Sequence, residues 1–271
     1  MLKKRLIFTL LHADREYQLS RNFGLQAVGD LQWLRENYDF DAIARSIDEL
    51  VVLNVGRGAR PAAPFAAHLR ELSANYFLPI AAGGGVRSLD DAYELMRANA
   101  DKLVLNSPFI DDPALVRSLA LTFGSQAVVA SIDCRRVGGR YRAFIHNGQT
   151  DTGIELKDMV KRAAESGAGE LYVTSMERDG TGFGYDLDMA AALVDATNLP
   201  IILSGGVGRN QHFCTGLALD GITGASTANI YNFIVGGLSR ARSHIVSEGI
   251  AMARWDGNIE RLKGAAAGAA I

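Results

Sequence analysis

Two glycine runs are the first feature of the sequence that could bind a ligand. The segment LPIAAGGGV covers residues 78–86, and LPIILSGGV, 121 positions later, covers residues 199–207. Glycine lets peptide N–H groups approach an anion without a Cβ in the way, and such groups bind phosphate at helix N-termini. The repeat predicts two matched phosphate sites. Glycines that serve only packing are the alternative interpretation.

Small polar residues near each glycine run extend the two predicted sites. They occur in LNSPF (105–109), in the DGT turn of TSMERDGTG (174–182) and in STANIYNF (226–233). Two sites imply a ligand with two phosphates, or with two anionic ends of that size.

Asp133, at the end of the apolar stretch AVVASID, is the candidate catalytic acid. An acid at the C-terminal end of a barrel strand is typical of a catalytic group. An ion pair with Arg135 or Arg136 is the structural alternative. Proton transfer at such a site usually needs a second group, so that one gives and the other takes a proton.

The 121-residue repeat predicts that this second group ends the first strand, in RLIFTLLHADRE. The equivalent position falls on Leu11 or His12, and neither residue is an acid. His12 could transfer protons, although a hydrogen-bonded loop histidine is the commoner case. Asp14 is near in sequence but further into the loop.

Short apolar runs alternate with amphipathic stretches along the chain. Helical spacing is clear in residues 31–47 and in residues 89–100, the latter preceded by a Ser88 cap. Strict alternation predicts a parallel sheet covered on both faces, and the count predicts a (βα)8 barrel, with a doubly wound open sheet as the alternative. We expect one barrel over residues 1–250, with half-barrels of about 1–122 and 123–250, and an extension over 251–271 whose end frays. The expected strands are 5–11, 49–55, 79–83, 101–106, 127–133, 170–175, 200–204 and 221–227.

Composition narrows the function classes. The 271 residues carry a formal charge of −2, which gives no general attraction to nucleic acid or anionic membranes. Cys134 and Cys214 lie in no metal-ligand spacing, the five histidines are scattered, and neither glycine run has the dinucleotide-binding pattern. We expect no metal and no cofactor. The start of the chain reads as a strand rather than a signal peptide, so a cytoplasmic location is expected.

Several segments, in this order, resemble the HisF-like cyclase-subunit family of imidazole glycerol phosphate synthase. They include IDELVVL, ADKLVLN, FGSQAVVASID, GAGELYVTSMERDGTGFGYD and SGGVG, and the resemblance covers roughly residues 1–250. It implies a (βα)8 barrel of two half-barrels, paired with a class I (HisH-like) glutaminase. It also implies that ammonia passes along the barrel axis and attacks a bisphosphorylated ribonucleotide at the mouth.

The resemblance extends to some site residues and not to others. A charged ring that gates ammonia entry is implied at Arg5, Glu49, Lys102 and Glu170, with a purely structural ion-pair ring as the alternative. The phosphate-site residues that the resemblance implies match in type: Gly84, Gly85, Asn106 and Ser107 on one side, and Asp179, Gly180, Thr181, Gly205 and Gly206 on the other, with a looser match at Ala228 and Asn229. Asp133 matches one catalytic acid, but Leu11 stands at the other. The family's substrate-contacting lysine is Leu19 here, and one of its acids is Asn54.

These departures favour a divergent ammonia-channelling subunit. Similar paralogues accompany sugar-amidating enzymes of surface-glycan pathways, where an ATP-dependent amidotransferase makes an acetamidino sugar. The first alternative is a true cyclase of histidine biosynthesis in which His12, Asp14 or another group replaces the missing acid. A related sugar-phosphate isomerase and a purely structural partner protein are further alternatives. The expected ligand is a phosphorylated small molecule, with no nucleic acid or membrane as a partner.

Overall fold

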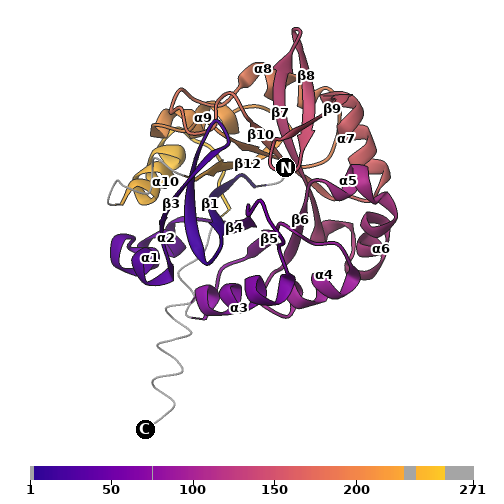
Figure 1. The fold of residues 1–271 in the computed structure, drawn as a ribbon. Helices are drawn as coiled ribbons and strands as arrows, with labels where there is room; N and C mark the ends of the chain where they lie inside the picture. The colour runs from indigo at the N-terminus through magenta and orange to yellow at the C-terminus, as the bar shows by residue number, and fades with distance from the viewer. Residues whose placement is uncertain (1–2, 75, 229–235, 254–271) are drawn as a thin grey trace.

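A computed structural model describes residues 3–74, 76–228 and 236–253 of the chain, and within them eight parallel strands close into a barrel. Pairing between β7 and β10 completes the circle, which confirms the predicted (βα)8 barrel over an open sheet. Figure 1 looks along the barrel axis, with helices around the strands. In spatial order the barrel strands are β1 (Arg5–Ala13), β4 (Glu49–Asn54), β5 (Ile80–Gly83), β6 (Lys102–Leu105), β7 (Val128–Val137), β10 (Glu170–Ser175), β11 (Ile201–Ser204) and β12 (Ile222–Thr227).

The helices surround this barrel, and half of the described helices begin at a side-chain cap. Asp30, Asp39, Ser88, Asp112 and Asp186 each accept a backbone N–H of the first turn. They precede α1, α2, α4, α6 and α8. The described helices are α1 (Leu31–Asn37), α2 (Phe40–Ser46), α3 (Ala62–Ser73), α4 (Leu89–Met96), α5 (Pro108–Asp111), α6 (Pro113–Phe123), α7 (Leu156–Glu165), α8 (Leu187–Val194), α9 (Asn210–Leu217) and α10 (Gly237–Ser247).

Two helix predictions need correction. The single helix expected over residues 31–47 is two helices, because Tyr38 is extended and Asp39 caps α2 through the Ala42 N–H at 2.9 Å. The helix expected over 89–100 ends at Met96, and Asn99 takes the left-handed conformation. The predicted C-terminal extension lies largely outside the described residues, since 254–271 are not described.

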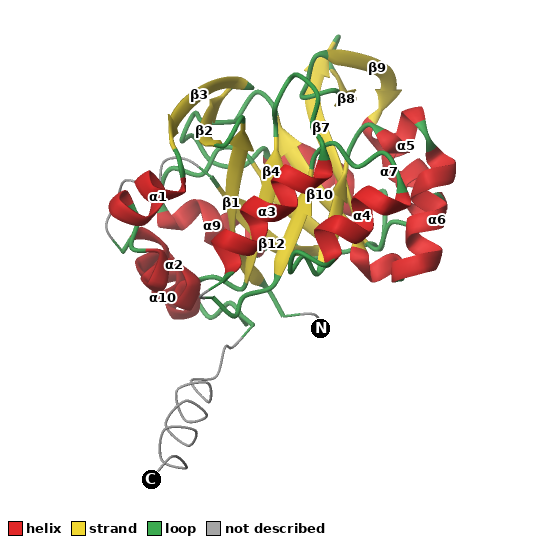
Figure 2. Ribbon diagram, turned by 60° about the horizontal axis from the view of Figure 1, so that its bottom comes forward, coloured by secondary structure: helices red, strands yellow, loops and turns green. Residues whose placement is uncertain are grey.

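Two hairpins extend the barrel wall at one end. The strands β1 and β7 run past the barrel and pair antiparallel with β2 (Glu16–Arg21) and β8 (Arg140–Ile145). The next strands, β3 (Gly24–Gly29) and β9 (Thr150–Glu155), complete the hairpins. Figure 2 shows both hairpins on one side of the barrel, opposite the N-terminus. Because parallel strands all point the same way, this end is the C-terminal mouth.

The barrel interior is packed in layers. Above the strand starts lies an apolar layer of Ile7, Val51, Ala81, Val104, Val129, Tyr172 and Ile202. The larger core lies between the strands and the helices. At the bottom, Arg242 of α10 holds buried Asp48 with two hydrogen bonds of 2.9 and 3.0 Å, and Asp48 accepts the Leu6 N–H. Within the described ranges, no helix is long and apolar enough to cross a bilayer.

Candidate functional site

A pocket of about 410 Å³ opens at the mouth of the barrel. The ends of the barrel strands form its floor, and the β2–β3 hairpin and the loops after β4 and β8 form its sides. Among the predicted site residues and the departures noted above, nine line it: Leu11, Asn54, Gly84, Gly85, Asn106, Ser107, Asp133, Asp179 and Ala228. Gly180, Thr181, Gly205 and Gly206 are not part of its lining, and Asn229 lies outside the described residues.

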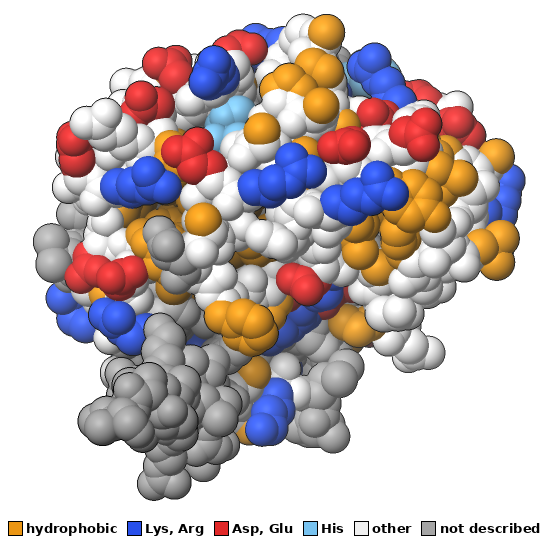
Figure 3. All heavy atoms as spheres, turned by 90° about the horizontal axis from the view of Figure 1, so that it is seen from below, with side chains coloured by type: hydrophobic (Ala, Val, Ile, Leu, Met, Phe, Trp, Pro, Cys, Tyr) orange, Lys and Arg blue, Asp and Glu red, His pale blue; other side chains and the backbone are white. Residues whose placement is uncertain are grey.

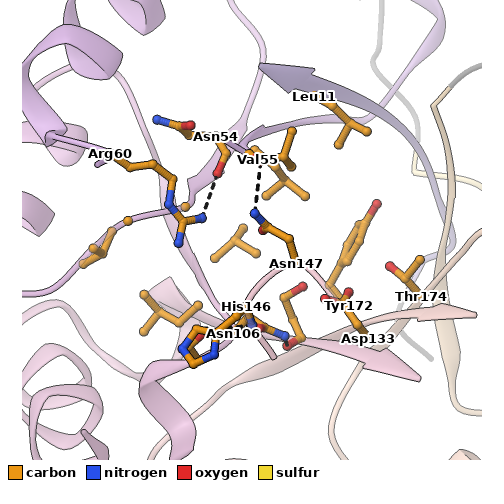
Figure 4. Close-up of a pocket in the computed structure, with 18 of the residues that line it drawn as sticks. Leu11, Asn54, Val55, Arg60, Asn106, Asp133, His146, Asn147, Tyr172 and Thr174 are labelled. Carbon is orange, nitrogen blue, oxygen red and sulfur yellow. Dashed lines mark hydrogen bonds between the residues drawn. The ribbon is translucent and has the colours of Figure 1, made fainter. Parts of the chain in front are cut away.

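The strand register decides which residue of β1 corresponds to Asp133. Asp133 pairs with Thr174, the fifth residue of β10, and Leu11 pairs with Leu53, the fifth residue of β4. Because β4 and β10 are the repeated strands, Leu11 holds the position equivalent to Asp133. Both side chains reach the pocket, from strands on opposite sides of the barrel (Figure 4). The second acid is therefore replaced by an apolar side chain.

His12 does not occupy the place of the missing acid. It points outward from β1 and is 5% exposed, with its ring stacked on His68 of α3 at 4.1 Å between centroids. Neither ring nitrogen of His12 has a hydrogen-bond partner among the described residues. Asp14 lies in the exposed turn between β1 and β2. Neither residue lines the pocket, so neither is placed to exchange protons with a ligand there.

Asp133 itself has the ionisation behaviour of an acid–base group. Burial raises its pKa to about 7, and the charge of Asp179 adds to the effect. A carboxyl group that titrates near neutral pH can give or take a proton with little energetic cost. Asp133 is therefore chemically suited to the acid–base role that the sequence analysis expects of it.

The β2–β3 hairpin contacts part of the second predicted phosphate rim, at Asp179 and Gly180. The Asp179 carboxylate accepts hydrogen bonds from the Ser20 hydroxyl at 2.5 Å and the Phe23 N–H at 3.0 Å. The Asn22 N–H donates to the Asp179 carbonyl oxygen at 3.0 Å. A Cβ on Gly180 would lie 2.4 Å from the Ser20 carbonyl oxygen, so glycine is required for this approach. Asp179 and Gly180 therefore hold the hairpin in this structure.

The first rim has polar side chains that are already engaged. The Asn106 amide donates to the carbonyl oxygens of Ser131 and Phe144, at 3.0 and 3.3 Å. The Ser107 hydroxyl accepts the His146 N–H at 3.2 Å. These contacts join the loop after β6 to the strands β7 and β8. The cations Arg57, Arg60 and Arg87 also line this part of the pocket, and the sequence analysis missed them, although NVGRGAR directly follows a strand.

The four predicted ring residues do meet at the bottom of the barrel. Each is the first residue of its strand. Lys102 Nζ lies 2.8 Å from Glu170 and 3.0 Å from Glu49, and Arg5 pairs with both acids. Burial opposes the charge of Arg5, but Glu170 and Glu49 outweigh it and raise its pKa. Each acid contacts both bases, an arrangement that offsets the desolvation of buried charges.

Tyr172 lies between this ring and the mouth pocket, and the sequence analysis did not single it out. It is 2% exposed and belongs to the apolar interior layer. Its hydroxyl lies 2.8 Å from Thr9, 2.9 Å from Ser204 and 3.2 Å from Ser226. A buried tyrosine usually needs such partners. Tyr172 also lines the pocket, so the hydroxyl cluster is part of its floor.

In the part of the chain that the structure describes, no three His, Cys, Asp or Glu side chains gather as metal ligands would.

A family model described as histidine biosynthesis protein matches residues 39–233. The chain is 40% identical over 257 residues to hisF2 of Parasynechococcus marenigrum (strain WH8102), provisionally named an imidazole glycerol phosphate synthase subunit; the match covers 94% of this chain and 95% of that protein.

Two further relatives are named imidazole glycerol phosphate synthase subunit HisF. The protein of Hyphomonas neptunium (strain ATCC 15444) is 36% identical over 250 residues, which cover 92% of this chain and 98% of the relative. The protein of Metallosphaera sedula (strain ATCC 51363) is 35% identical over 230 residues, which cover 85% of this chain and 90% of the relative. The similarity therefore extends over nearly the whole barrel.

The raised pKa of Asp133 predicts that Asp133→Asn stabilises the protein at high pH. The folded state keeps a proton that the unfolded chain loses above about pH 4, so wild-type stability falls as pH rises from about 4 to 7. Asparagine removes this loss. Urea unfolding should show a gain of about 1–3 kcal/mol at pH 8 and convergence near pH 4. The exposed Asp195→Asn is the control, and identical curves for wild type and Asp133→Asn would refute the assignment.

The His12–His68 stack predicts the opposite pH dependence. Burial lowers the pKa of His12 to about 4, with His68 as the second cause. The unfolded chain takes up a proton below about pH 6.5 that the folded state excludes, so stability is lost as pH falls from 6.5 to 4. His12→Phe keeps a ring without unpaired nitrogens. We expect its gain over wild type to be larger at pH 5 than at pH 8 in thermal unfolding; an equal gain at both values would contradict this.

Proposed function

The chain belongs to the histidine biosynthesis family and, within it, to the HisF cyclase subunits of imidazole glycerol phosphate synthase, and from this premise we propose a divergent role. The barrel receives ammonia from a class I glutaminase partner and channels it to its mouth for amination of a phosphorylated substrate. The pathway is the biosynthesis of an acetamidino sugar for a surface glycan. An ATP-dependent sugar amidotransferase is the third component.

The observation that carries this proposal is a contrast between the two ends of the barrel. All four residues of the charged ring are present at the bottom, whereas one acid of the expected pair is missing at the mouth. Arg5, Glu49, Lys102 and Glu170 form every ion pair that two acids and two bases can form. At the mouth, the position equivalent to Asp133 is leucine. Loss of one acid of a pair typically costs about 10²–10⁴-fold in rate. Ammonia entry and proton transfer are thus separable in this chain, and only the residues for entry are intact.

The interior between ring and mouth limits how ammonia could travel. The lower part is apolar, which suits a neutral molecule and excludes ions. Above it, ammonia has to pass the ring of Tyr172 and can exchange hydrogen bonds with the hydroxyls of Thr9, Ser204 and Ser226. Because all these groups are neutral, the route selects ammonia over ammonium. The charged ring would remove the extra proton or exclude ammonium at the entrance.

The partner is expected at the bottom of the barrel, where the ring opens. Phe77 lies in the loop between α3 and β5 and is 88% exposed. This loop leads into the N-terminal end of β5, which lies at the bottom of the barrel, as the charged ring does. An exposed phenylalanine is a typical anchor residue of a protein interface. It supports a docking surface for the glutaminase around the ring.

A true cyclase of histidine biosynthesis is the second candidate. The pKa of Asp133 near 7 favours it, because a group that titrates there could act in turn as acid and base. Asp179 is a second carboxyl group in the pocket lining, but it is engaged with Ser20 and Phe23. Cyclase activity would require the hairpin to release it.

Turnover of the bisphosphorylated family substrate, with saturating ammonium salt and no glutaminase, separates the two candidates. We expect the natural chain to show no robust turnover, because Leu11 cannot transfer protons. Leu11→Asp restores the acid, with Leu53→Asp, its neighbour in the register, as the matched control. A gain only in Leu11→Asp would show that proton transfer alone was lost, whereas silence in both would show that binding has changed too. Robust turnover by the natural chain would contradict the proposal.

Association with a class I glutaminase tests the partner. Phe77→Asp should raise the dissociation constant by about tenfold or more, because it places a charge at the centre of an apolar contact. Phe183→Asp is the matched control: Phe183 is 77% exposed but lies in the loop after β10, at the mouth. Calorimetry on the two purified proteins measures both. Equal effects of the two variants, or no binding by the natural chain, would contradict docking at the bottom.

A further inference from the structure

Three arginines at the mouth have no role in the function proposed so far. Arg57 and Arg60 come from the loop between β4 and α3, and Arg87 precedes α4. All three line the mouth pocket next to Gly84 and Gly85. In Figure 4 the guanidinium group of Arg60 lies at the edge of the pocket, across from Asp133 and Thr174. The rim of the first half-barrel is therefore cationic.

These arginines differ from those on the outside of the barrel. On the side covered by α3 and α4, basic and acidic side chains are interspersed (Figure 3), and the ion pairs Arg35–Glu71 and Arg70–Glu94 measure 3.7 and 3.6 Å. No ion pair within the described ranges includes Arg57, Arg60 or Arg87. Their charges are not neutralised by the chain.

Arg60 is the most constrained of the three. It is partly buried, and its Nε is buried without a hydrogen-bond partner. One terminal nitrogen donates to the Asn54 carbonyl oxygen at 3.2 Å, which is the dashed line in Figure 4. Burial, and then the charge of Arg87, lower the pKa of Arg60. A partly buried cation beside another cation gains free energy when an anion binds.

The backbone around Arg60 fixes it over the glycine run. A Cβ on Gly85 would lie 2.6 Å from the Arg60 Cβ and 2.7 Å from its carbonyl oxygen, and Gly85 also has a φ of +88°. The Asn54 side chain accepts the Gly56 N–H at 3.2 Å, which shapes the start of the loop. Because Asn54 is neutral, it leaves the charge of Arg60 available to a ligand.

The other polar groups near this rim are used within the chain. Asp111 pairs with His146 at 3.0 Å, and Asp112 caps α6 through the Leu115 N–H at 3.0 Å. Asn106 and Ser107 are engaged with β7 and β8, as described above. An anion at this rim would therefore meet arginine donors first. Guanidinium groups bind phosphoryl oxygens with two hydrogen bonds each, so three of them, which come from two different loops of this rim, can bind the oxygens of more than one phosphoryl group.

We propose that Arg57, Arg60 and Arg87, together with the Gly84–Gly85 backbone, bind the diphosphate group of a ligand. Both phosphoryl groups lie on the first rim, since the β2–β3 hairpin already engages Asp179 and Gly180 of the second. The substrate class is then a diphosphate ester, such as a nucleoside diphosphate conjugate, and not a molecule with two separated monophosphates. This inference rests on the proposed function, in which the mouth accepts a phosphorylated substrate, and it specifies that substrate.

Calorimetric titration of the full chain with inorganic phosphate and inorganic pyrophosphate tests the proposal at constant salt. We expect pyrophosphate to bind about tenfold or more tightly than phosphate, and UDP to displace it. Arg60→Gln should weaken pyrophosphate binding about tenfold while changing phosphate binding by less than about threefold. Arg70→Gln, on the outer face of α3, is the matched control and should bind like wild type.

Three outcomes would overturn the proposal: equal affinity for the two anions, wild-type pyrophosphate affinity in Arg60→Gln, or no displacement by UDP. If Arg60→Gln fails to fold, Arg60→Lys decides, because it keeps the charge and loses the planar fork; an unchanged preference for pyrophosphate would then count against the proposal. The titration needs no glutaminase, ammonia or turnover. Its failure would therefore leave the tests of Leu11 and Phe77 unaffected.

Discussion

Closure of the barrel between β7 and β10 fixes the depth at which each side chain meets the axis. Because the strands are parallel and staggered in a closed barrel, the first residues of four of them form the charged ring, and residues at the far ends form the mouth pocket. The same closure brings Glu49 and Glu170 within reach of both Arg5 and Lys102. No local element could place these groups alone. The fold thus separates the charged ring from the mouth pocket by the length of a strand.

Sequence reasoning was strong where a pattern repeats and weak where tertiary contacts decide. The alternation of elements predicted the barrel, and the repeated glycine runs marked the mouth. The 121-residue repeat could not choose between Leu11 and His12, since an offset drifts with insertions, whereas the register of β1 against β4 chooses Leu11. The sequence analysis also did not predict the two hairpins or the break between α1 and α2 at Tyr38, because exposed strands and short loops show little hydrophobic periodicity.

The missed residues share a physical reason. Tyr172 reads as one more apolar residue of a strand, and only the barrel brings Thr9, Ser204 and Ser226 to its hydroxyl. Arg60 reads as a surface loop residue, and only its contacts with Gly85 and Asn54 show that it is partly buried. Conversely, Asn106 and Ser107 matched a phosphate site in type, but the structure uses their side chains to join strands. Residue type alone therefore did not show that these side chains also hold the loop after β6 in place.

The departures from the family pattern at positions 11 and 54 change the charge of the mouth in the same direction, because each replaces an acid with a neutral residue. An acid at position 54 would lie beside Arg60 and would compete with a ligand for its guanidinium group, whereas asparagine shapes the loop through Gly56 and stays neutral. Leucine at position 11 places an apolar side chain in the pocket where an acid would add a second negative charge, and burial still raises the pKa of Asp133. The mouth is therefore less acidic and more cationic than an acid pair would make it. Such a pocket favours binding an anionic group over cycling protons, while the ring below keeps its full set of charges.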